Sequence, residues 1–398
     1  MKIKIGVIFG GNSVEHEISI ISALWALGFI NEEKYEIVPL YITKKQEWYT
    51  GKALLESKNF GDIPSLLKKC KNVILVADKG RFFLQNKKGF KTSVAEIEIA
   101  FPIVHGTNVE DGVLQGHLET IGIPFVGSNV LASAVGQDKV IMKQIFASGN
   151  LPIVPYLWFF DAEYIEDEQA ILNQIDELGY PVIVKPAELG SSIGITKAKN
   201  KKEVIEAIET ACTYSTKVVV EKCVDNLMEV NCSVMGNYQN YSYSTLEEVM
   251  GKDEILSYQD KYVGNTKTKG GAKRTGMASA ARIIPARISA ELQKAIEETA
   301  IKATRLINSS GVVRIDFLIN KETEEYFINE INSIPGDLAF WLWPNKNPEA
   351  FVEELIQIAV KNAQIKKKKT FSFDTNILQS IGNLNGTKGK IKISDFDC

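Results

Sequence analysis

The chain has 398 residues, of which 45% are hydrophobic and 24% are charged, the balance of a globular protein with roughly two or three domains. Its formal net charge of −3 gives no electrostatic reason to expect nucleic acid or a membrane surface as the main partner, and no stretch approaches the ~20 apolar residues of a membrane span. The five cysteines lack CxxC spacing, which argues against a zinc site and a disulfide framework and fits a reducing compartment. We therefore expect a cytoplasmic protein.

An α/β domain with a parallel sheet is predicted for residues 1–126. Apolar runs that alternate with helical or irregular segments predict strands at 3–9, 35–41, 72–77 and 97–104.

The first of these strands runs into the glycine turn GGNSVEHEIS and a helix, an arrangement that usually favours anions. Here Glu15 and Glu17 would repel a phosphate and attract a cation such as an ammonium group, although acids are also ordinary in a first helical turn. The last strand leads into HGTNVEDGVLQGHLE, which reads either as a ligand-facing loop that carries Glu110 or as the start of a capped helix.

A second region is predicted for residues 127–221. Its first helix, at 133–147, carries Lys139 and Lys143 four residues apart on one face, and most helical lysines are solvated. Strands are expected at 151–161 and 180–185, with a helix at 168–178 between them.

A loop of small residues follows Lys185, which ends the strand at 180–185. Such residues let backbone N–H groups approach a polyphosphate, and the lysine meets its charge; a glycine–serine hairpin without a ligand is the alternative. The loop contains Gly190, Ser191, Ser192 and Gly194.

A helix is expected at 201–212 and a strand at 218–220, before the segment EKCVDNLMEV. Residues 221–224 could bind an adenine base and Glu229 its ribose. By itself this is a weak signal. A loop rich in glycine, lysine and threonine covers 256–287, and such a loop inside an enzyme is usually a lid or disordered. Ser289 then caps a predicted helix.

A hairpin is predicted near the C-terminal end, with strands at 312–319 and 326–331. Residues two apart on a strand point to one face, so Arg314 lies with Asp316, and Glu330 with Asn332. If the two faces coincide, oxygen ligands suited to Mg²⁺ gather beside a guanidinium that neutralises a transferred phosphoryl or acyl group. A solvated hairpin face with ordinary ion pairs is the alternative. A helix at 348–363 follows.

Six motifs occur in the order found in D-alanine–D-alanine ligases of the ATP-grasp superfamily, which the chain resembles over about residues 3–362. They are GGNSVEHEIS, HGTNVEDGVLQGHLE, VIVKPAELGSSIG, DKY, VRIDF and INEINSIPG. The resemblance implies an ATP-grasp fold with an N-terminal domain at 1–126, a central lid subdomain at 127–221 and a C-terminal metal-binding subdomain at 222–365. The polar extension 366–398 has no counterpart in the family.

The resemblance also implies roles for particular residues. Those that resemble nucleotide-binding residues serve the phosphates (Lys139, Lys185, Gly190, Ser192 and Lys261), the adenine hinge (Glu221, Lys222 and Val224) and the ribose (Glu229). Those that resemble ligands of two Mg²⁺ ions, with Mn²⁺ as an alternative metal, are Asp316, Glu330 and Asn332. Glu15 resembles the acceptor of the first substrate's ammonium, Arg314 the guanidinium that stabilises the oxyanion, and the set that latches the 256–287 loop comprises Glu15, Ser191 and Tyr262.

The implied activity is ATP-dependent joining of two D-alanines through an acyl-phosphate, for peptidoglycan synthesis, with small-molecule substrates and with a homodimer left open. The alternatives are a ligase of the same mechanism with another second substrate, such as D-serine, and a degenerate ATP-binding protein. Trp341 falls where the family has a serine that grips the second substrate's carboxylate, and an indole offers no hydroxyl. Tyr262 favours an amino acid over a hydroxy acid as second substrate.

Overall fold

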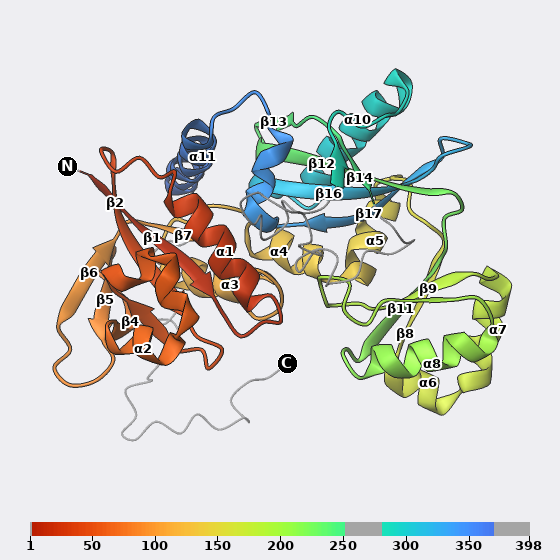
Figure 1. The fold of residues 1–398 in the computed structure, drawn as a ribbon, viewed down its shortest axis with the longest axis horizontal. Coiled ribbons are helices and arrows are strands. Elements are labelled where there is room, and N and C mark those ends of the chain that lie inside the picture. Colours follow the sequence, from red (N-terminus) through yellow and green to blue (C-terminus); the bar gives the residue numbers. More distant parts are fainter. Residues whose placement is uncertain (1, 251–280, 370–398) are drawn as a thin grey trace, which may run out of the picture. The chain divides into compact units, whose positions relative to one another are not determined.

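The computed structural model describes residues 2–250 and 281–369, so the predicted site residues Lys261 and Tyr262 lie outside the described residues. One compact unit spans Met1–Val360 and holds three sheets (Figure 1). Within the described ranges, no helix is both long and apolar enough to cross a bilayer.

The first sheet and its helices comprise β1 (Ile3–Gly10), α1 (His16–Leu27), β2 (Tyr35–Ile42), β3 (Trp48–Thr50), η1 (Lys52–Leu55), η2 (Ser57–Gly61), α2 (Ile63–Lys68), β4 (Lys71–Asp78), β5 (Arg81–Asn86), β6 (Ser93–Ile97), β7 (Ile99–Pro102) and α3 (Val113–Ile121). The strand order is β6-β5-β4-β3-β2-β1-β7. β1 pairs in parallel with β2 and β7, as predicted, whereas β3 to β6 extend the sheet by antiparallel pairing.

The single strand predicted at 97–104 is two strands with different partners. β6 and β7 occupy opposite edges of the sheet, yet only Glu98 separates them in the chain. The sheet therefore curls until its edges meet, and the chain passes from one edge to the other at Glu98. The predicted range contained β7 but only the last residue of β6, Ile97, because β6 is mostly half-buried and includes polar residues.

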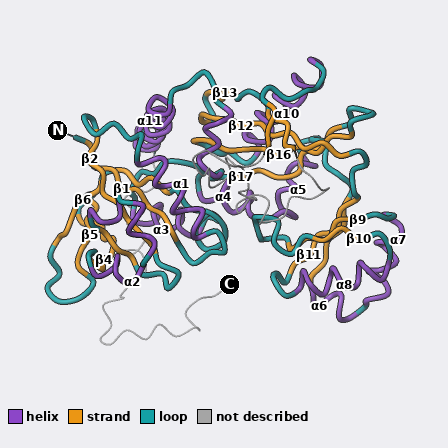
Figure 2. Tube along the Cα trace, in the orientation of Figure 1, coloured by secondary structure: helices purple, strands orange, loops and turns teal. Residues whose placement is uncertain are grey.

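The second sheet belongs to β8 (Tyr156–Phe160), α6 (Asp161–Glu166), α7 (Glu168–Leu178), β9 (Val182–Pro186), β10 (Thr196–Ala198), α8 (Lys201–Cys212) and β11 (Lys217–Lys222). Its order is β10-β9-β11-β8, with antiparallel pairing throughout, and the helices cover one face (Figures 1 and 2). α7 and α8 have the predicted bounds, because Asp167 and Asn200 cap their first turns.

The third sheet and its helices comprise α4 (Val130–Gln137), α5 (Lys139–Ser148), β12 (Leu227–Asn237), β13 (Asn240–Tyr243), β14 (Glu247–Met250), β15 (Ala281–Ile283), α10 (Ala290–Leu306), β16 (Gly311–Asn320) and β17 (Tyr326–Asn332). The strand order is β15-β14-β12-β16-β17, with β13 beside β12. As predicted, Ser289 caps α10 by accepting the Leu292 N–H (3.2 Å).

The helix predicted at 133–147 is two helices, α4 and α5. Asp138 between them has an extended backbone (φ −90°, ψ 104°), and its carboxylate accepts the N–H groups of Val140 (2.9 Å) and Ile141 (3.1 Å). An aspartate at this place ends one helix and caps the next. The break at Asp138 sets the orientation of α5 and therefore the direction in which the side chains of Lys139 and Lys143 point.

The two faces of the third sheet differ in chemistry. Ile315, Phe317 and Ile319 of β16 are fully buried in a core shared with α10. Arg314 and Asp316, which alternate with these residues along β16, point to the other face. One face of this sheet thus supplies a core, and the other supplies polar groups.

The segment after β17 forms η4 (Gly336–Leu342) and α11 (Pro348–Lys367), four residues longer than the predicted helix. Three consecutive non-glycine residues of η4, Asp337, Leu338 and Ala339, have left-handed φ values of 44°, 53° and 52°. Leu338 and Phe351 share the core of the first sheet, so the chain returns to that sheet after crossing the third.

We expect Gly311→Ala to destabilise the fold more than Gly80→Ala. Both glycines have left-handed φ values (+78° and +76°), but an added Cβ would lie 2.7 Å from the Gly127 Cα at Gly311 and would meet open space at Gly80. The backbone conformation costs about 1–2 kcal/mol in both variants, and the clash adds about 1–3 kcal/mol at Gly311. Urea unfolding of both variants measures the difference; equal losses would contradict the packing role of Gly311.

Candidate functional site

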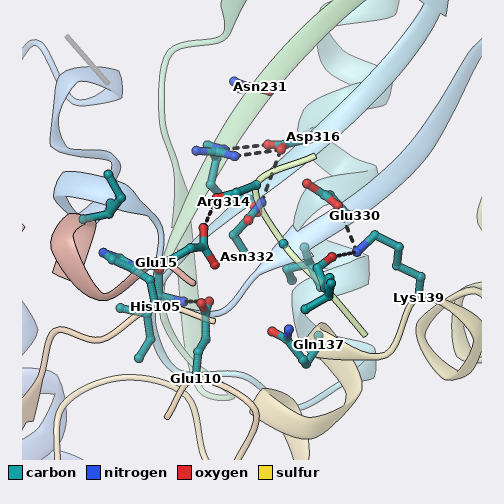
Figure 3. Close-up of a pocket in the computed structure, with 18 of the residues that line it drawn as sticks. Glu15, His105, Glu110, Gln137, Lys139, Asn231, Arg314, Asp316, Glu330 and Asn332 are labelled. Atoms are coloured by element: carbon teal, nitrogen blue, oxygen red, sulfur yellow. Dashed lines mark hydrogen bonds and ion pairs between the residues drawn. The ribbon is translucent and has the colours of Figure 1, made fainter. Parts of the chain in front are cut away.

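The polar face of the third sheet carries a continuous row of functional groups. Strand register places Glu330 opposite Asp316, Asp316 opposite Asn231, and Asn231 opposite Glu247. Arg314 pairs with Asn332 in the adjacent position. The expectation that the two hairpin faces coincide is therefore correct, and Figure 3 shows Arg314, Asp316, Asn332 and Glu330 around one cavity.

Arg314 and Asp316 form a bidentate ion pair, with 2.6 Å from Nε to Oδ1 and 2.7 Å from the terminal nitrogen to Oδ2. Burial by itself lowers the pKa of Arg314, but the Asp316 carboxylate outweighs it, so the pKa is raised and the guanidinium stays charged. Asn332 Nδ2 donates to Asp316 Oδ2 at 3.2 Å. The guanidinium is held rigidly, beside the carboxylate expected to bind metal.

Asp316, Glu330 and Asn332 fit a hard divalent cation. Their donors are two carboxylates and one amide, and Mg²⁺ favours such oxygen ligands together with nucleotide phosphates. In the part of the chain that the structure describes, no three His, Cys, Asp or Glu side chains form a metal-binding group. An ion here would take its remaining ligands from a bound nucleotide and water.

A second cavity, of about 800 Å³, lies beside this face and is lined by the second and third sheets. The structure brings nearly all the predicted nucleotide residues together in its walls. They are Lys139, Lys185, Gly190, Ser192, Glu221, Lys222, Val224 and Glu229, and the predicted latch residue Ser191 and metal ligands Asp316 and Glu330 also line the cavity. Lys261 is the exception, because it lies outside the described residues.

A buried charge cluster lines this cavity. Glu221 lies between two lysines, 2.6 Å from Lys185 Nζ and 2.9 Å from Lys143 Nζ. Burial alone raises the pKa of Glu221, but the two ammonium groups outweigh it and hold the pKa at about 2. The cluster keeps one net positive charge for an anionic ligand.

The solvated reading of the α5 lysines is wrong for both. Lys143 is fully buried, and Lys139 is 6% exposed. Lys139 Nζ donates to the Leu189 carbonyl (2.6 Å) and lies 3.8 Å from Glu330 (Figure 3). Burial lowers the pKa of each lysine, and nearby carboxylates oppose this. Helical spacing alone could not distinguish this face from a solvated one.

Asn329 contacts Lys185 in this cavity, and it was not among the residues predicted for the site. Phe317 pairs with Ile328 and Asp316 with Glu330, so Asn329 is the extra residue of a β-bulge. Its Oδ1 accepts a hydrogen bond from Lys185 Nζ at 3.2 Å. A signal existed in the sequence, because the buried Ile328 and Ile331 are three apart, which breaks the two-residue period of a strand.

The small-residue loop contacts Glu15. Ser191 and Ser192 have left-handed φ values of 56° and 59°, and the Ser191 hydroxyl donates to Glu15 Oε1. A Cβ on Gly190 would lie 2.8 Å from Glu15 Oε2, so a larger residue there would displace the Glu15 carboxylate. Two members of the predicted latch therefore meet, and the third, Tyr262, lies outside the described residues.

Glu110 and His105 line the same cavity as Glu15 and Arg314. Glu110 accepts the N–H groups of Gly106 and Ile334, both at 2.9 Å (Figure 3). Burial, with the nearby Glu15 charge, raises the pKa of Glu110 to about 8. Burial lowers the pKa of His105 to about 4, so its imidazole is neutral at pH 7.

Comparison with known proteins agrees with this geometry. Two family models match, described as D-ala D-ala ligase N-terminus over residues 4–128 and D-ala D-ala ligase C-terminus over residues 145–357. A D-alanine–D-alanine ligase of Thermosipho melanesiensis is 39% identical over 382 residues, which cover 95% of this chain and 98% of that one. One from Bacillus pumilus is 37% identical over 382 residues, with 93% and 100% covered.

Solved structures give the same result. VanG D-Ala:D-Ser ligase from Enterococcus faecalis matches with a TM-score of 0.74 and 30% identity, over 90% of this chain and 100% of that one. The D-alanine–D-alanine ligase from Coxiella burnetii matches with a TM-score of 0.75 and 25% identity, over 92% and 96%. The predicted ATP-grasp α/β fold is thus confirmed, and the chain belongs to the D-alanine–D-alanine ligase family of ATP-dependent ligases.

Proposed function

We propose that this protein joins two D-alanines at the expense of ATP, through an acyl-phosphate, for peptidoglycan synthesis. One observation carries the proposal: Lys139, Ser191, Asp316 and Glu330 line both cavities. The larger cavity holds the residues proposed for ATP, and the smaller holds Glu15 and Arg314. The two cavities therefore meet where a phosphoryl group would pass from ATP to a carboxylate.

The nucleotide roles follow from charge and position. Lys139 and Lys185, with the backbone N–H groups of the Gly190–Gly194 turn, are proposed to hold the phosphates. The adenine is assigned to Glu221, Lys222 and Val224, and the ribose to Glu229. Asp316, Glu330 and Asn332 are proposed to hold two Mg²⁺ ions, with Mn²⁺ as the alternative. Bound metal would neutralise charge on the phosphates.

The remaining residues act on the amino acids. Glu15 is proposed to receive the first substrate's ammonium, which leaves its carboxylate free to attack the γ-phosphoryl group of ATP. Arg314 is proposed to stabilise the acyl-phosphate and the oxyanion that forms when the second amine attacks. The 256–287 loop is proposed to exclude water, with Ser191 and Tyr262 as its latch to Glu15.

The proposal includes a cytoplasmic location and the four segments 1–126, 127–221, 222–365 and 366–398 as separate parts of the protein. It favours D-alanine over D-serine as the second substrate, because the curated relatives named above are D-alanine–D-alanine ligases. The intact set of Lys185, Arg314, Asp316, Glu330 and Asn332 speaks against a degenerate ATP-binding protein, since nucleotide binding alone would not need Arg314 in the amino-acid cavity.

A screen of phosphate release tests the proposed substrates. Purified protein with ATP and Mg²⁺ is given D-alanine alone and then pairs of D-alanine with other amino acids. We expect D-alanine alone to release phosphate and to yield the dipeptide by mass spectrometry. Release with another pair, and none with D-alanine alone, would replace D-alanine as the second substrate.

The role of Arg314 is tested by Arg314→Ala, with Arg305→Ala on the exposed side of α10 as the matched control. We expect kcat to fall about 10²–10³-fold in the first variant, because one preorganised donor to an oxyanion is worth that much. ATP affinity, measured by calorimetry, should change little in either variant. Unchanged turnover in Arg314→Ala would remove the assignment.

The raised pKa of Glu110 predicts that the stability of the protein depends on pH. This pKa is raised from 4.5 to about 8, so the folded protein holds this proton more tightly than the unfolded chain does. The stabilisation that results is fully present below pH 4.5 and is lost as the pH rises toward 8. We expect the melting temperature to fall less between pH 5 and 8 in Glu110→Gln than in the wild type. Parallel profiles would show that Glu110 is ionised throughout.

A further inference from the structure

The residue at which this chain departs from its family, Trp341, is partly buried and contacts a buried carboxylate. Its indole Nε1 donates to Glu247 Oε2 at 3.0 Å, and Asn231 Nδ2 donates to the same oxygen at 3.2 Å. The Arg282 guanidinium lies over the Trp341 ring, 4.3 Å from its centroid. Trp341 thus supplies no hydroxyl, but it supports a cation.

Strand register turns Arg282 toward the amino-acid cavity. Arg282 of β15 pairs with Val249 of β14, which lies two residues from Glu247 and so on the same face. The cavity that contains Glu15 and Arg314 is also lined by Arg282. The Arg282 side chain is 14% exposed, so a ligand that met it would be largely shielded from water.

Glu247 balances the charge of Arg282 without using its donors. Arg282 Nε lies 3.2 Å from Glu247 Oε1, within ion-pair distance, but the N–H lacks the alignment of a hydrogen bond. Asp337 also attracts Arg282, and the Asp337 backbone N–H donates to the Ser22 hydroxyl at 3.0 Å. Within residues 2–250 and 281–369, no acceptor takes a hydrogen bond from this guanidinium, so its planar donors are available to a ligand.

The negative charge of the second substrate requires a cationic hydrogen-bond donor in this cavity. Its amine must be neutral to attack, so the reactive amino acid carries one uncompensated negative charge on its carboxylate. Arg314 is committed to Asp316 by two hydrogen bonds. Among the described residues, Arg282 is the other arginine that lines this cavity, and a guanidinium matches a carboxylate with two parallel N–H groups.

We propose that Arg282, supported by Trp341 and neutralised by Glu247, binds the carboxylate of the second amino acid. The inference rests on the proposed ligase function and adds a requirement to it: the acceptor is an amino acid with a free α-carboxylate. The stacked guanidinium takes the place of the hydroxyl that the family serine would supply.

The test compares two acceptors in Arg282→Gln, with Arg305→Gln as the matched control. D-Alanine and D-alaninamide are each supplied as acceptor for the donor D-alanine, and both products are quantified by mass spectrometry. We expect the KM for acceptor D-alanine to rise about 10–100-fold, as for the loss of hydrogen bonds to a charged group, with the KM values of ATP and donor unchanged. The preference of the wild type for D-alanine over D-alaninamide should shrink by the same factor.

Two further variants keep the test decisive if Arg282→Gln folds poorly. Arg282→Lys keeps the positive charge beside Glu247 but loses the planar fork, so an intermediate rise in the acceptor KM is expected. Trp341→Phe keeps a ring face under the guanidinium, and we expect it to weaken acceptor binding less than Trp341→Leu does.

An unchanged acceptor KM in Arg282→Gln, or equal losses with D-alanine and D-alaninamide, would overturn the assignment of Arg282. Failure of the wild type to make D-alanyl-D-alanine is a different result, since it overturns the proposed substrates. The variants are then compared on the acceptor that the phosphate-release screen identifies, with its amide as the second acceptor.

Discussion

The pairing of β16 with β17 places a guanidinium and the three side chains proposed as metal ligands within one small area. In an antiparallel pair, residues directly opposite share a face, so the register that sets Asp316 against Glu330 also sets Arg314 against Asn332. A slip of one residue would turn all four side chains into the α10 core. The alternating apolar residues prevent this, because Ile315 and Phe317 would then face water. The hydrophobic core of the third sheet thereby determines the geometry of its polar face.

Neutralisation of charge is the second constraint on this site. Glu221 holds two lysines, Asp316 holds Arg314, and Glu247 balances Arg282. A buried charge without a partner costs several kcal/mol, so each cation that waits for an anionic ligand needs a carboxylate beside it. The protein can therefore fold with its cationic groups already in position. Binding of the proposed phosphate and carboxylate ligands would then require little rearrangement.

Local sequence was sufficient to predict those elements whose bounds depend on interactions between residues close together in the chain. Asp167 and Asn200 begin α7 and α8 because their side chains cap the first turn, and these helices have the predicted bounds. The alternation of β16 predicted both its core and its polar face. Local pattern failed where one residue changes the geometry: Asp138 divides a predicted helix in two, and Asn329 inserts a bulge. Both residues had a recognisable signal, a capping side chain and a broken period.

The sequence by itself determined the class of fold and the identity of the family, and it predicted the groups that we propose to hold phosphate and metal, because these depend on short motifs whose residues act close to one another. The tertiary structure alone decided which lysines are buried, that Asn329 meets Lys185, and that Arg282 lies over Trp341. Arg282 and Trp341 are 59 residues apart in the numbering. Their contact depends on strand pairing and on the left-handed turn of η4, neither of which leaves a local pattern in the chain.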